Sequence, residues 1–545
     1  ATNSYAISDI ERVNLTNGNL NLSIPLASLP PIAGGELGLT LSANYNSKMW
    51  DTARSELQPD PLNINSRYAI SQMQLSGGGW NIDARYFITF EDASFDYAWL
   101  PPAQNDPEYE LLTLNRWSKV VLYTPDGATH ELRPKDYSCY SDFFGKHPYL
   151  RGYYKDDPNT ANASLRYYSF DGSHLWVKID PSPLLYSGIV PSWTLYLPDG
   201  TKVEQSAGIQ RITDTNGNKI KIWGETDGAG VSTTHYQDEL TGREIKYVYN
   251  PAGNGGQGQG QVQYQTVGGA WMTITVNYGT TRVFGKTYWI NDALCPDAAD
   301  YVDETITVIR SIVFPQTEPG LPGRQFTFNY NSDTVVGQNQ QWRPDCNPSY
   351  ITFTSASDGW GSLSHMEMPS GATVNYAYDF DGLHALTNPD DAPRESLVTK
   401  TVTHDGTTDT WTYANSPGGG GVTNPDGSQI IETMYPYDRA FAHNYAGFGG
   451  KEGLVYRSDN SGKTRVERHW TLVNFGGDTF APGPGVVVAF NPVVDAEYTS
   501  LMEGGQPVKM SAKTSQYDFN CNLLQEIQYD WFDPALVSRD AQGVP

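Results

Sequence analysis

The segment WTLYLPDGTKVE, Trp193–Glu204, decides the fold. Apolar and polar residues alternate at its two ends, and Pro198-Asp199-Gly200 separates them. Proline fixes φ at the first turn position, the Asp side chain accepts a hydrogen bond from the nearby backbone, and glycine takes the left-handed conformation. The two ends then fold back on each other, so the segment predicts a β-hairpin.

This unit recurs along the chain. A strand, a Pro-Asp-Gly turn and a second strand are also predicted around Pro125-Asp126-Gly127 and around Pro425-Asp426-Gly427. Related hairpins that lack one element are predicted at Pro369-Ser370-Gly371 and at Asp405-Gly406. No amphipathic helix of about twelve or more residues is found, so the sequence predicts an all-β fold, an extended sheet of hairpin repeats.

Composition agrees with many short strands joined by tight turns. The 545 residues include 53 Gly, 35 Pro, 35 Tyr and 14 Trp. Glycine and proline favour turns, whereas aromatic residues favour strands. Because 38% of the residues are hydrophobic and only 18% are charged, the chain has enough apolar surface to fold.

The chain is strongly acidic, with a formal net charge of −25. Phosphate binding needs clustered Lys and Arg, so nucleic acid is excluded as a partner and anionic membranes are disfavoured. No run of about 18 apolar residues is present, so no membrane insertion is expected. The chain begins at Ala1 without a Met or a signal segment, which fits a mature secreted product and equally fits a partial chain.

The first residues predict further hairpins. Leu20, Leu22 and Ile24 alternate with polar residues after Asn17-Gly18, a pair that accepts the positive φ angles of a two-residue turn. A stretch that alternates as well as Ser4–Pro25 either pairs within its own chain or adds as a strand to a neighbouring copy.

Two glycine-rich stretches look like seams, Pro251–Gly260 and Ser416–Gly421. Both are expected to be flexible loops. Similar hairpins are predicted on either side of each, which favours one extended β structure over separate globules.

One repeat near the end of the sequence can be compared with a known family. The segment Tyr517-Asp518-Phe519-Asn520-Cys521-Asn522-Leu523-Leu524, followed by Tyr529-Asp530, closely resembles the YD repeat of Rhs-type proteins, with Cys521 where the family usually has Gly. The segment Ile209–Ile222, IQRITDTNGNKIKI, is similar to the family's hairpins that follow a PDGT turn. Asn14–Trp50 resembles the region that precedes the repeats.

This resemblance implies a secreted or surface-associated protein whose repeats coil into a β-sheet shell, which in some members encloses a toxin domain. The Tyr of each repeat is expected to stack on its equivalent, and the Asp to accept backbone N–H bonds at the following turn. Asp533-Pro534-Ala535-Leu536 is only a weak echo of the family's self-cleavage motif. The chain is therefore expected to form part of a shell.

Four regions are expected along the chain. Residues 1–135 form an N-terminal β-rich module, 136–255 carry hairpins with PDG and NGN turns, 262–415 form a sheet region, and 423–545 carry YD-like repeats. Cys295 and Cys346 lie in polar, Pro-bearing segments of the third region, where a disulfide between them and free buried thiols both remain open. With Cys139 and Cys521 added, no spacing fits a zinc site.

Candidate chemistry is sparse. None of the nine His residues falls at a metal-ligand spacing, and neither a Gly-x-Ser-x-Gly elbow nor a phosphate-binding loop is present. His404-Asp405 is predicted to be a turn, because neighbours on a strand point to opposite faces. Asp214-x-Asn216-x-Asn218 with Glu225 echoes a calcium loop, but Lys219 stands where such a loop needs Gly, and a hairpin turn explains the same residues. No catalytic residue, metal or cofactor is predicted.

A carbohydrate-binding protein or glycoside hydrolase would have a similar acidic and aromatic composition. Such a hydrolase needs two carboxylates roughly 5–9 Å apart, and Asp390-Asp391 and Asp409 lie on predicted loops near aromatic residues. The pairs Tyr435 with Tyr437 and Tyr153 with Tyr154 would form a glycan platform if exposed, and are packing residues otherwise.

Together these features predict a non-catalytic extracellular structural protein, secreted or at the cell surface. It would be a YD-repeat β-shell or scaffold segment of a toxin shell, an adhesin or a polymer. The expected partners are other copies of itself or further segments of a longer Rhs-type chain, with a glycan as a further option. The alternative function is a carbohydrate-binding protein or glycoside hydrolase on a β scaffold.

Overall fold

The computed structural model is almost entirely β-structure, which confirms the predicted all-β fold. The structure describes residues 4–8, 10–15, 18–31, 34–55, 67–72, 78–99, 111–125, 128–134, 153–154, 165–169, 172–179, 192–266, 268–289, 299–316, 324–334, 340–343, 350–353, 359–380, 395–416, 418–435, 454–474, 490–518 and 521–539. Its short helical elements are α1 (Gly253–Gly256), η2 (Asn331–Thr334) and η4 (Pro534–Leu536).

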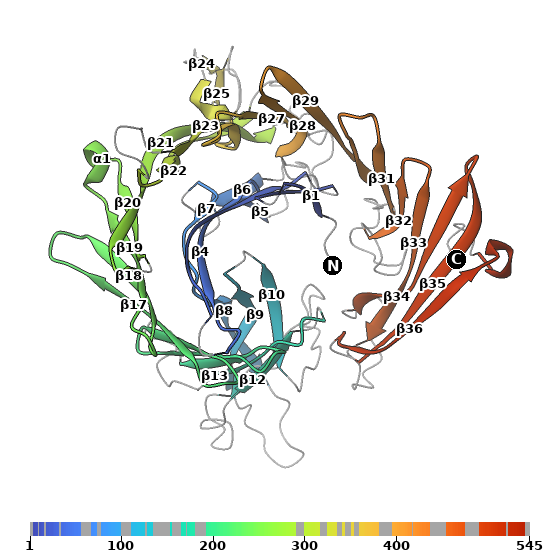
Figure 1. Ribbon diagram of the computed structural model, residues 1–545, viewed down its shortest axis with the longest axis horizontal. Helices are drawn as coiled ribbons and strands as arrows, with labels where there is room; N and C mark the ends of the chain where they lie inside the picture. Colours follow the sequence, from blue (N-terminus) through green and yellow to red (C-terminus); the bar gives the residue numbers. More distant parts are fainter. Residues whose placement is uncertain are drawn as a thin grey trace.

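One large antiparallel sheet, called the wall below, curls around the molecule (Figure 1). Its strands are β8 (Phe87–Trp99), β9 (Leu111–Tyr123), β10 (Thr129–Pro134), β11 (Tyr153–Tyr154), β12 (Leu165–Ser169), β13 (Trp176–Ile179), β14 (Trp193–Tyr196), β15 (Lys202–Ser206), β16 (Ile209–Thr213), β17 (Lys219–Thr226), β18 (Ser232–Asp238), β19 (Glu244–Asn250), β20 (Gln259–Gln265), β21 (Trp271–Trp289), β22 (Ala299–Val313), β23 (Gln325–Tyr330), β26 (Leu363–Glu367), β27 (Thr373–Phe380), β28 (Glu395–His404), β29 (Thr407–Ser416), β30 (Gly419–Thr423), β31 (Gln429–Met434), β32 (Val455–Asn460), β33 (Thr464–Asn474), β34 (Phe490–Glu503), β35 (Gln506–Tyr517) and β36 (Leu523–Phe532). From β12 to β23 and from β26 to β36, each strand pairs with the next one along the chain, and β23 pairs with β26. The right-handed twist of each strand pair accumulates, so a sheet this wide curves.

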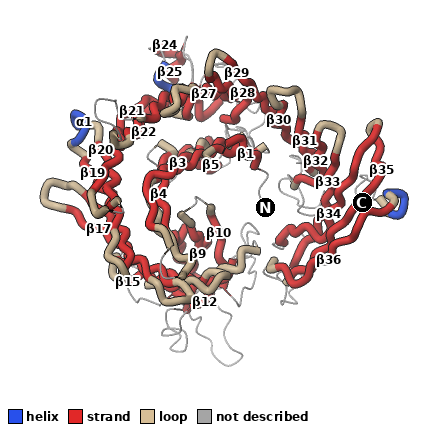
Figure 2. The backbone as a smooth tube through the Cα atoms, in the orientation of Figure 1, coloured by secondary structure: helices blue, strands red, loops and turns tan. Residues whose placement is uncertain are grey.

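A second, smaller sheet lies inside the curve of the wall (Figures 1 and 2). This inner sheet has the strand order β1 (Ser4–Ser8), β2 (Glu11–Asn14), β3 (Leu20–Leu29), β4 (Leu39–Asn46) and β7 (Trp80–Asn81). Successive side chains of a strand point to opposite faces. On β3, Leu20, Leu22 and Ile24 are accordingly buried, while Asn21 and Ser23 lie on the other, more exposed face. Two short hairpins, β5 (Trp50–Ser55) with β6 (Arg67–Gln72) and β24 (Gln340–Arg343) with β25 (Tyr350–Phe353), form separate two-stranded sheets. β6 contacts β21, and β25 contacts β22.

The main core lies between the inner sheet and the wall. Leu22 and Leu41 of the inner sheet belong to the same buried apolar cluster as Ile245 and Val262 of the wall. Strand β3 contacts β19 and β20 directly. Removal of this apolar surface from water is the main force that holds the two layers together.

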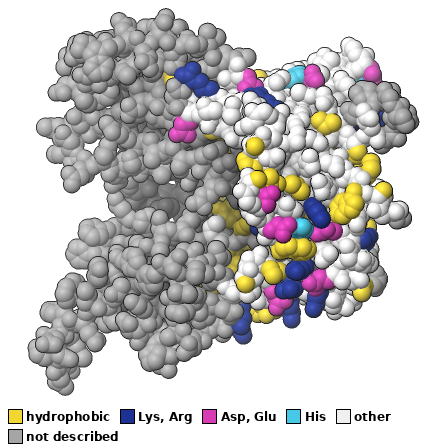
Figure 3. Space-filling model, turned by 90° about the vertical axis from the view of Figure 1, so that its left-hand side faces the viewer, with side chains coloured by type: hydrophobic (Ala, Val, Ile, Leu, Met, Phe, Trp, Pro, Cys, Tyr) yellow, Lys and Arg dark blue, Asp and Glu magenta, His cyan; other side chains and the backbone are white. Residues whose placement is uncertain are grey.

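The outer face of the wall is polar and mixed in charge. Figure 3 shows basic, acidic and hydrophobic side chains interspersed on the face that it presents. On β17 and β18 the Trp223 and His235 rings stack with centroids 4.5 Å apart, and Lys221 Nζ lies 4.5 Å from the Trp223 ring centroid. His235 Nδ1 is 2.7 Å from Glu244 Oε1 on β19. Cross-strand pairs of this kind stabilise neighbouring strands.

The prediction of a flexible loop is wrong for Gly419–Gly421, whereas residues 251–258 form a mostly exposed turn that includes α1 between β19 and β20. Gly419–Gly421 lie in β30, a buried strand, and Gln259 and Gly260 begin β20. A Cβ atom at Gly420 would lie 1.9 Å from the Leu15 carbonyl oxygen. Glycine is needed there because the inner sheet's backbone approaches the wall closely.

The N-terminal hairpin forms within its own chain, but its turn differs from the prediction. β1 pairs with β2 and β2 pairs with β3. The loop between β2 and β3 is longer than two residues and is closed by the Asn14 N–H, which donates to the Asn19 carbonyl at 2.9 Å. Leu15 is buried, and the Gly18 carbonyl accepts a hydrogen bond from Leu397 N in the wall at 3.2 Å. The loop is long because it docks on the wall.

Candidate functional site

The candidate functional site is the interface between the inner sheet and the wall. Apolar packing covers most of it, but side chains with hydrogen-bonding groups are buried at three places, called anchors 1, 2 and 3 below. A buried polar group needs a defined partner, because an unsatisfied one costs about 1–3 kcal/mol. The anchors therefore fix the position of one layer on the other, which apolar packing alone specifies less sharply.

Anchor 1 is a buried ion pair. Lys400 Nζ on β28 lies 2.8 Å from Glu11 Oε1 on β2, and the side chains are only 3% and 2% exposed. The Tyr376 hydroxyl on β27 donates to Glu11 Oε2 at 2.9 Å. Burial lowers the pKa of Lys400, although Glu11 opposes this effect. Burial raises the pKa of Tyr376 well above its usual value, and the negative charge of Glu11 adds to the shift.

Anchor 2 joins two aromatic side chains of the inner sheet to the wall. Trp80 Nε1 on β7 donates to the Tyr330 hydroxyl on β23 at 2.8 Å. The Tyr330 hydroxyl donates in turn to the Ile309 carbonyl at 2.5 Å. The Tyr45 hydroxyl on β4 accepts a hydrogen bond from Leu363 N at 2.8 Å. The Tyr45 and Trp80 ring centroids are 5.1 Å apart, so the two anchoring rings also support each other.

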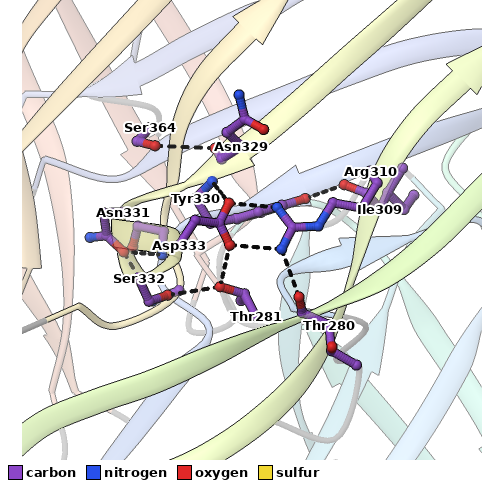
Figure 4. A network of polar contacts seen from close by, with 12 residues as sticks. Thr280, Thr281, Ile309, Arg310, Asn329, Tyr330, Asn331, Ser332, Asp333 and Ser364 are labelled. Atoms are coloured by element: carbon purple, nitrogen blue, oxygen red, sulfur yellow. Dashed lines mark hydrogen bonds and ion pairs between the residues drawn. The ribbon is translucent and has the colours of Figure 1, made fainter. Parts of the chain in front are cut away.

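A charged network beside Tyr330 holds the wall side of anchor 2 (Figure 4). Asp333 in η2 receives two hydrogen bonds from the Arg310 guanidinium, at 2.5 and 2.7 Å. It also accepts from Tyr330 N at 2.8 Å and from the Thr281 hydroxyl at 2.8 Å. Desolvation would raise the pKa of Asp333, but these bonds outweigh it, and the pKa lies below its usual value. The carboxylate stays ionised and fixes Tyr330 through its backbone.

Anchor 3 lies where the chain leaves β7 and enters the wall. Arg85 binds Asp83 through Nε and Nη2, at 2.8 and 2.6 Å from Oδ2. The Tyr236 hydroxyl on β18 donates to Asp83 Oδ1 at 3.1 Å. The Gln210 side chain on β16 forms two hydrogen bonds with the backbone of Tyr86, both of 3.0 Å. The crossing segment is thus held by two wall strands.

Comparisons with known proteins give structural likenesses at low sequence identity. The chain is similar to the crystal structure of TcdB2-TccC3, with a TM-score of 0.45 and 10% identity over 97% of this chain and 45% of that one. It is similar to the same complex without its hypervariable C-terminal region, with a TM-score of 0.46 and 9% identity over 98% and 45% of the two chains. A Tc holotoxin pore of Photorhabdus luminescens, with a substitution in TccC3, gives a TM-score of 0.30 and 10% identity over 100% and 44%.

The chain spans less than half the length of these solved chains. No family model matches the sequence. No curated protein matches it either.

The structure places the Pro-Asp-Gly motif in a turn of five residues. Between β14 and β15, Leu197 N donates to the Thr201 carbonyl at 2.9 Å, and Gly200 N donates to the Leu197 carbonyl at 3.0 Å. Asp199 Oδ1 accepts from Thr201 N at 2.8 Å, and Gly200 has a φ of +87°. Asn424–Ser428, which contains Pro425-Asp426-Gly427, has the same two backbone bonds, and Gly427 has a φ of +80°.

The YD-type segment ends in the same kind of turn. Asp518 Oδ1 accepts from Asn522 N at 2.8 Å, and its Oδ2 accepts from Asn522 Nδ2 at 2.9 Å. Asp214 receives the equivalent bonds from Asn218, at 2.8 and 2.9 Å. Desolvation would raise the pKa of Asp214, but the bonds from Asn218 and Asn216 outweigh it and hold the pKa below its usual value. The segment that echoes a calcium loop is therefore built as a hairpin turn, with both oxygens of Asp214 bonded inside it.

Cys521 occupies the glycine position of the YD-type turn. Its φ is +62°, where the equivalent Gly217 has +84°. A residue with a Cβ is strained in this region. The Cys521 side chain is buried, at 4% exposure, and its carbonyl oxygen would lie 3.0 Å from a Cβ at Gly172. The turn packs closely against the loop between β12 and β13.

The other residues of the YD-type segment, Tyr517, Tyr529 and Asp530, each lie in different surroundings in the described part of the chain. The Tyr517 hydroxyl donates to the Val494 carbonyl at 3.0 Å. The expected stacking of Tyr517 on an equivalent Tyr is not found in the part of the chain that the structure describes. Tyr529 is 48% exposed, and Asp530 Oδ1 accepts from Trp531 N at 2.8 Å.

The structure places His404, a candidate for a catalytic pair, and Tyr435, a candidate for a glycan platform, in defined surroundings. His404 ends β28 beside a tight turn in which Asp405 and Gly406 have φ values of +48° and +77°, so the prediction of a turn is confirmed. His404 Nε2 lies 3.2 Å from Asp409 Oδ2 across the hairpin. Tyr435 is buried and packs on Tyr456 with ring centroids 4.8 Å apart, which rules it out as an exposed glycan platform.

Several predicted residues lie outside the described residues. These are Asp126, Gly127, Cys139, Cys295, Cys346, Asp390, Asp391 and Tyr437, together with the side chains of Tyr153 and Tyr154. Pro125 is described, next to Thr124, whose N–H donates to the Ala128 carbonyl at 3.0 Å.

No helix among the described residues is both long enough and apolar enough to cross a membrane. No cluster of three or more His, Cys, Asp and Glu side chains in that part of the chain could hold a metal ion.

Sequence reasoning missed all three anchors. Glu11 and Lys400 each look like an ordinary polar residue of an alternating strand. One signal was present: Glu11 lies two residues before Val13, so both side chains point to the same, apolar face of β2. A charged residue at a core position demands a buried partner, although its sequence position does not say which one.

Proposed function

We propose that this chain is a wall segment of a secreted or cell-surface shell of the Rhs type, and that its role is mechanical. It forms a continuous curved barrier, and it uses no catalytic residue. Its partners are other copies of itself or further segments of a longer Rhs-type chain. A toxin shell is the first use that we propose, because shells that enclose a toxin domain are built from YD repeats.

The observation that carries this proposal is the double-layered construction. The wall is made of consecutive hairpins, several of which close with the same five-residue turn. The inner sheet is fixed on the inside of the wall by both an apolar core and three polar anchors. Strand-to-strand hydrogen bonds run along the whole curve, so a load on one hairpin is shared by its neighbours.

The ionisable groups favour a structural role over catalysis. His235 is held between Glu244 and Glu225, at 2.7 and 3.3 Å, while its ring is stacked on Trp223. His469 Nδ1 lies 2.6 Å from Asp495 Oδ1 across two wall strands. Each pair links adjacent strands, which accounts for these residues without a reaction.

The test is made on the protein isolated from the cells or medium that produce it. The intact particle is treated with a protease, and the surviving polypeptides are identified by mass spectrometry. A shell should protect a second polypeptide or chain segment, and denaturation before protease should abolish the protection. A particle of one chain that protects nothing would overturn the shell proposal.

Two further assays address the alternative function. Saturable binding on a glycan array would support a carbohydrate-binding protein, and release of reducing sugar from a polysaccharide would support a glycoside hydrolase. We expect neither.

A further inference from the structure

A groove of about 550 Å³ lies at the seam between the inner sheet and the wall. On one side are residues of the connection between β3 and β4, such as Glu36 and Leu37, and on the other side are the wall turns that hold Asp199 and Asp214. Its volume is within the range of ligand-binding clefts, which is about 300–1,000 Å³.

The groove has charge of only one sign. Its lining includes the carboxylates of Glu36, Asp199 and Asp214, and none of the described lining residues is Lys, Arg or His. Glu36 and Asp199 have no ion-pair partner among the described residues. Asp214 is kept ionised by the hydrogen bonds of its turn, which hold its pKa below the usual value.

Apolar side chains line the same space. Leu37, Leu197, Ile212 and Tyr86 contribute to the groove, and Ile212 is nearly buried, at 7% exposure. A long basic side chain is complementary to this groove, because its methylene stem can pack on the apolar side chains while its charged end reaches a carboxylate.

The two sides of the groove are held at a fixed distance. A Cβ at Gly35 would lie 2.2 Å from Asn218 Nδ2 and 2.5 Å from Asp214 Oδ2, so the connection between β3 and β4 rests directly on the Asp214 turn. The groove is therefore preformed, which reduces the entropy lost on binding.

We propose that this groove binds a basic segment of a partner polypeptide, with a Lys or Arg side chain between Glu36, Asp199 and Asp214 and neighbouring apolar side chains on Leu37 and Leu197. Charge complementarity selects this occupant over an acidic peptide, because an anion would face three carboxylates and no basic side chain in the described lining.

The probe is an acetylated and amidated Leu-Arg-Leu peptide, titrated by calorimetry into the intact protein. We expect saturable binding that weakens when salt is raised, because partly exposed charge pairs are screened. The same peptide with Gln in place of Arg should bind at least about fivefold more weakly. Equal binding of the two peptides, or no saturable binding of either, would overturn the proposal.

The variants Glu36→Gln and Asp199→Asn should each weaken binding about two- to fivefold, the range of an exposed ion pair. Asparagine keeps the oxygen that accepts from Thr201 N, so the turn is retained while the charge is lost. The matched control is Asp426→Asn, which makes the same change in the same kind of turn outside the groove. If Asp426→Asn weakens binding as much as Asp199→Asn, the effect is one of net charge and the groove is not the site. Failure here leaves the wall role intact, because the protease-protection test does not involve the groove.

Discussion

Lys400 Nζ lies 2.8 Å from Glu11 Oε1, and this pair joins a wall strand to the inner sheet in surroundings that exclude water. The two charges stabilise each other only while both are present. Removing one leaves the other buried without a counterion, which costs about 3–5 kcal/mol.

We therefore expect Lys400→Met or Glu11→Gln alone to lower the free energy of unfolding by about 3–5 kcal/mol in urea titrations. The double variant Glu11→Leu with Lys400→Met should lose less than either single variant, because it leaves no unpaired charge. Lys509→Met, at an exposed position of β35, is the control and should change stability by less than about 0.5 kcal/mol. Additive losses in the double variant would show that the pair is not coupled.

Alkaline pH should destabilise the protein through its buried tyrosines. Burial raises the pKa values of Tyr236, Tyr330 and Tyr376 well above 10, and that of Tyr278 to about 12. Above about pH 10, the ordinary pKa of tyrosine, the unfolded chain releases these protons while the folded chain keeps them, so stability falls as pH rises. Each such group costs about 1.4 kcal/mol per pH unit until its folded pKa is reached. The pKa of Lys400 is lowered, so its titration makes stability rise with pH. This single group is outweighed by the several buried tyrosines.

The measurement is urea unfolding between about pH 9 and pH 11, where the slope gives the difference in bound protons. Tyr278→Phe keeps the ring and removes one titrating hydroxyl, so it should reduce the alkaline slope by about one proton. A flat profile across this range would contradict the expectation.

Gly420→Ala should separate the layers at the β2–β3 loop. The added methyl group would meet the Leu15 carbonyl at 1.9 Å, so either the loop or the strand must move. Overpacking of this kind costs about 1–3 kcal/mol or more, and hydrogen exchange should become faster around Leu15. Gly228→Ala is the control, because no atom lies within 4 Å of its added Cβ. Equal effects of the two variants would show that the close approach at Gly420 does not matter.

Asp214→Ala should loosen one hairpin and leave the rest of the wall folded. It removes the oxygens that bond Asn216 N, Asn218 N and Asn218 Nδ2, at a cost of about 1–3 kcal/mol. Asp214→Asn retains an acceptor and should lose less. Hydrogen exchange should become faster only in β16 and β17, and a loss of protection across the whole wall would contradict this quasi-independent behaviour of the repeats.

Cys521→Gly should be more stable than Cys521→Ala by about 1 kcal/mol. Both variants remove the thiol, but only glycine accepts the φ of +62° without strain. Thermal unfolding compares the two directly. If alanine is equally stable, the turn has relaxed away from the left-handed conformation.

Local features could be predicted from the sequence. The Pro198-Asp199-Gly200 turn depends on residues that are neighbours in the chain, and so does the hydrogen bonding around Asp214. Each residue's intrinsic preference acts within one hairpin, so the strand pattern and the all-β class follow.

Contacts between distant segments could not be predicted. The Tyr376 hydroxyl reaches Glu11 across 365 residues of sequence, and no pattern near either residue names the other. The glycines at 419–421 show the same limit, because a run of Gly looks flexible until the Leu15 backbone is seen beside it. Packing between the inner sheet and the wall determines both the Tyr376–Glu11 hydrogen bond and the burial of the glycines. The pattern of a single sequence does not show which layers pack together.

The anchoring of the inner sheet also sets an order of events during synthesis. The residues that form β2, β3 and β4 leave the ribosome well before Lys400, which neutralises Glu11. Until the wall strands that cover it, such as β19 and β20, have emerged, the apolar side of the newly made inner sheet stays uncovered, and exposed apolar surface promotes aggregation. A chaperone that shields β2, β3 and β4 would therefore raise the yield of folded protein more than one that acts on β34, β35 and β36.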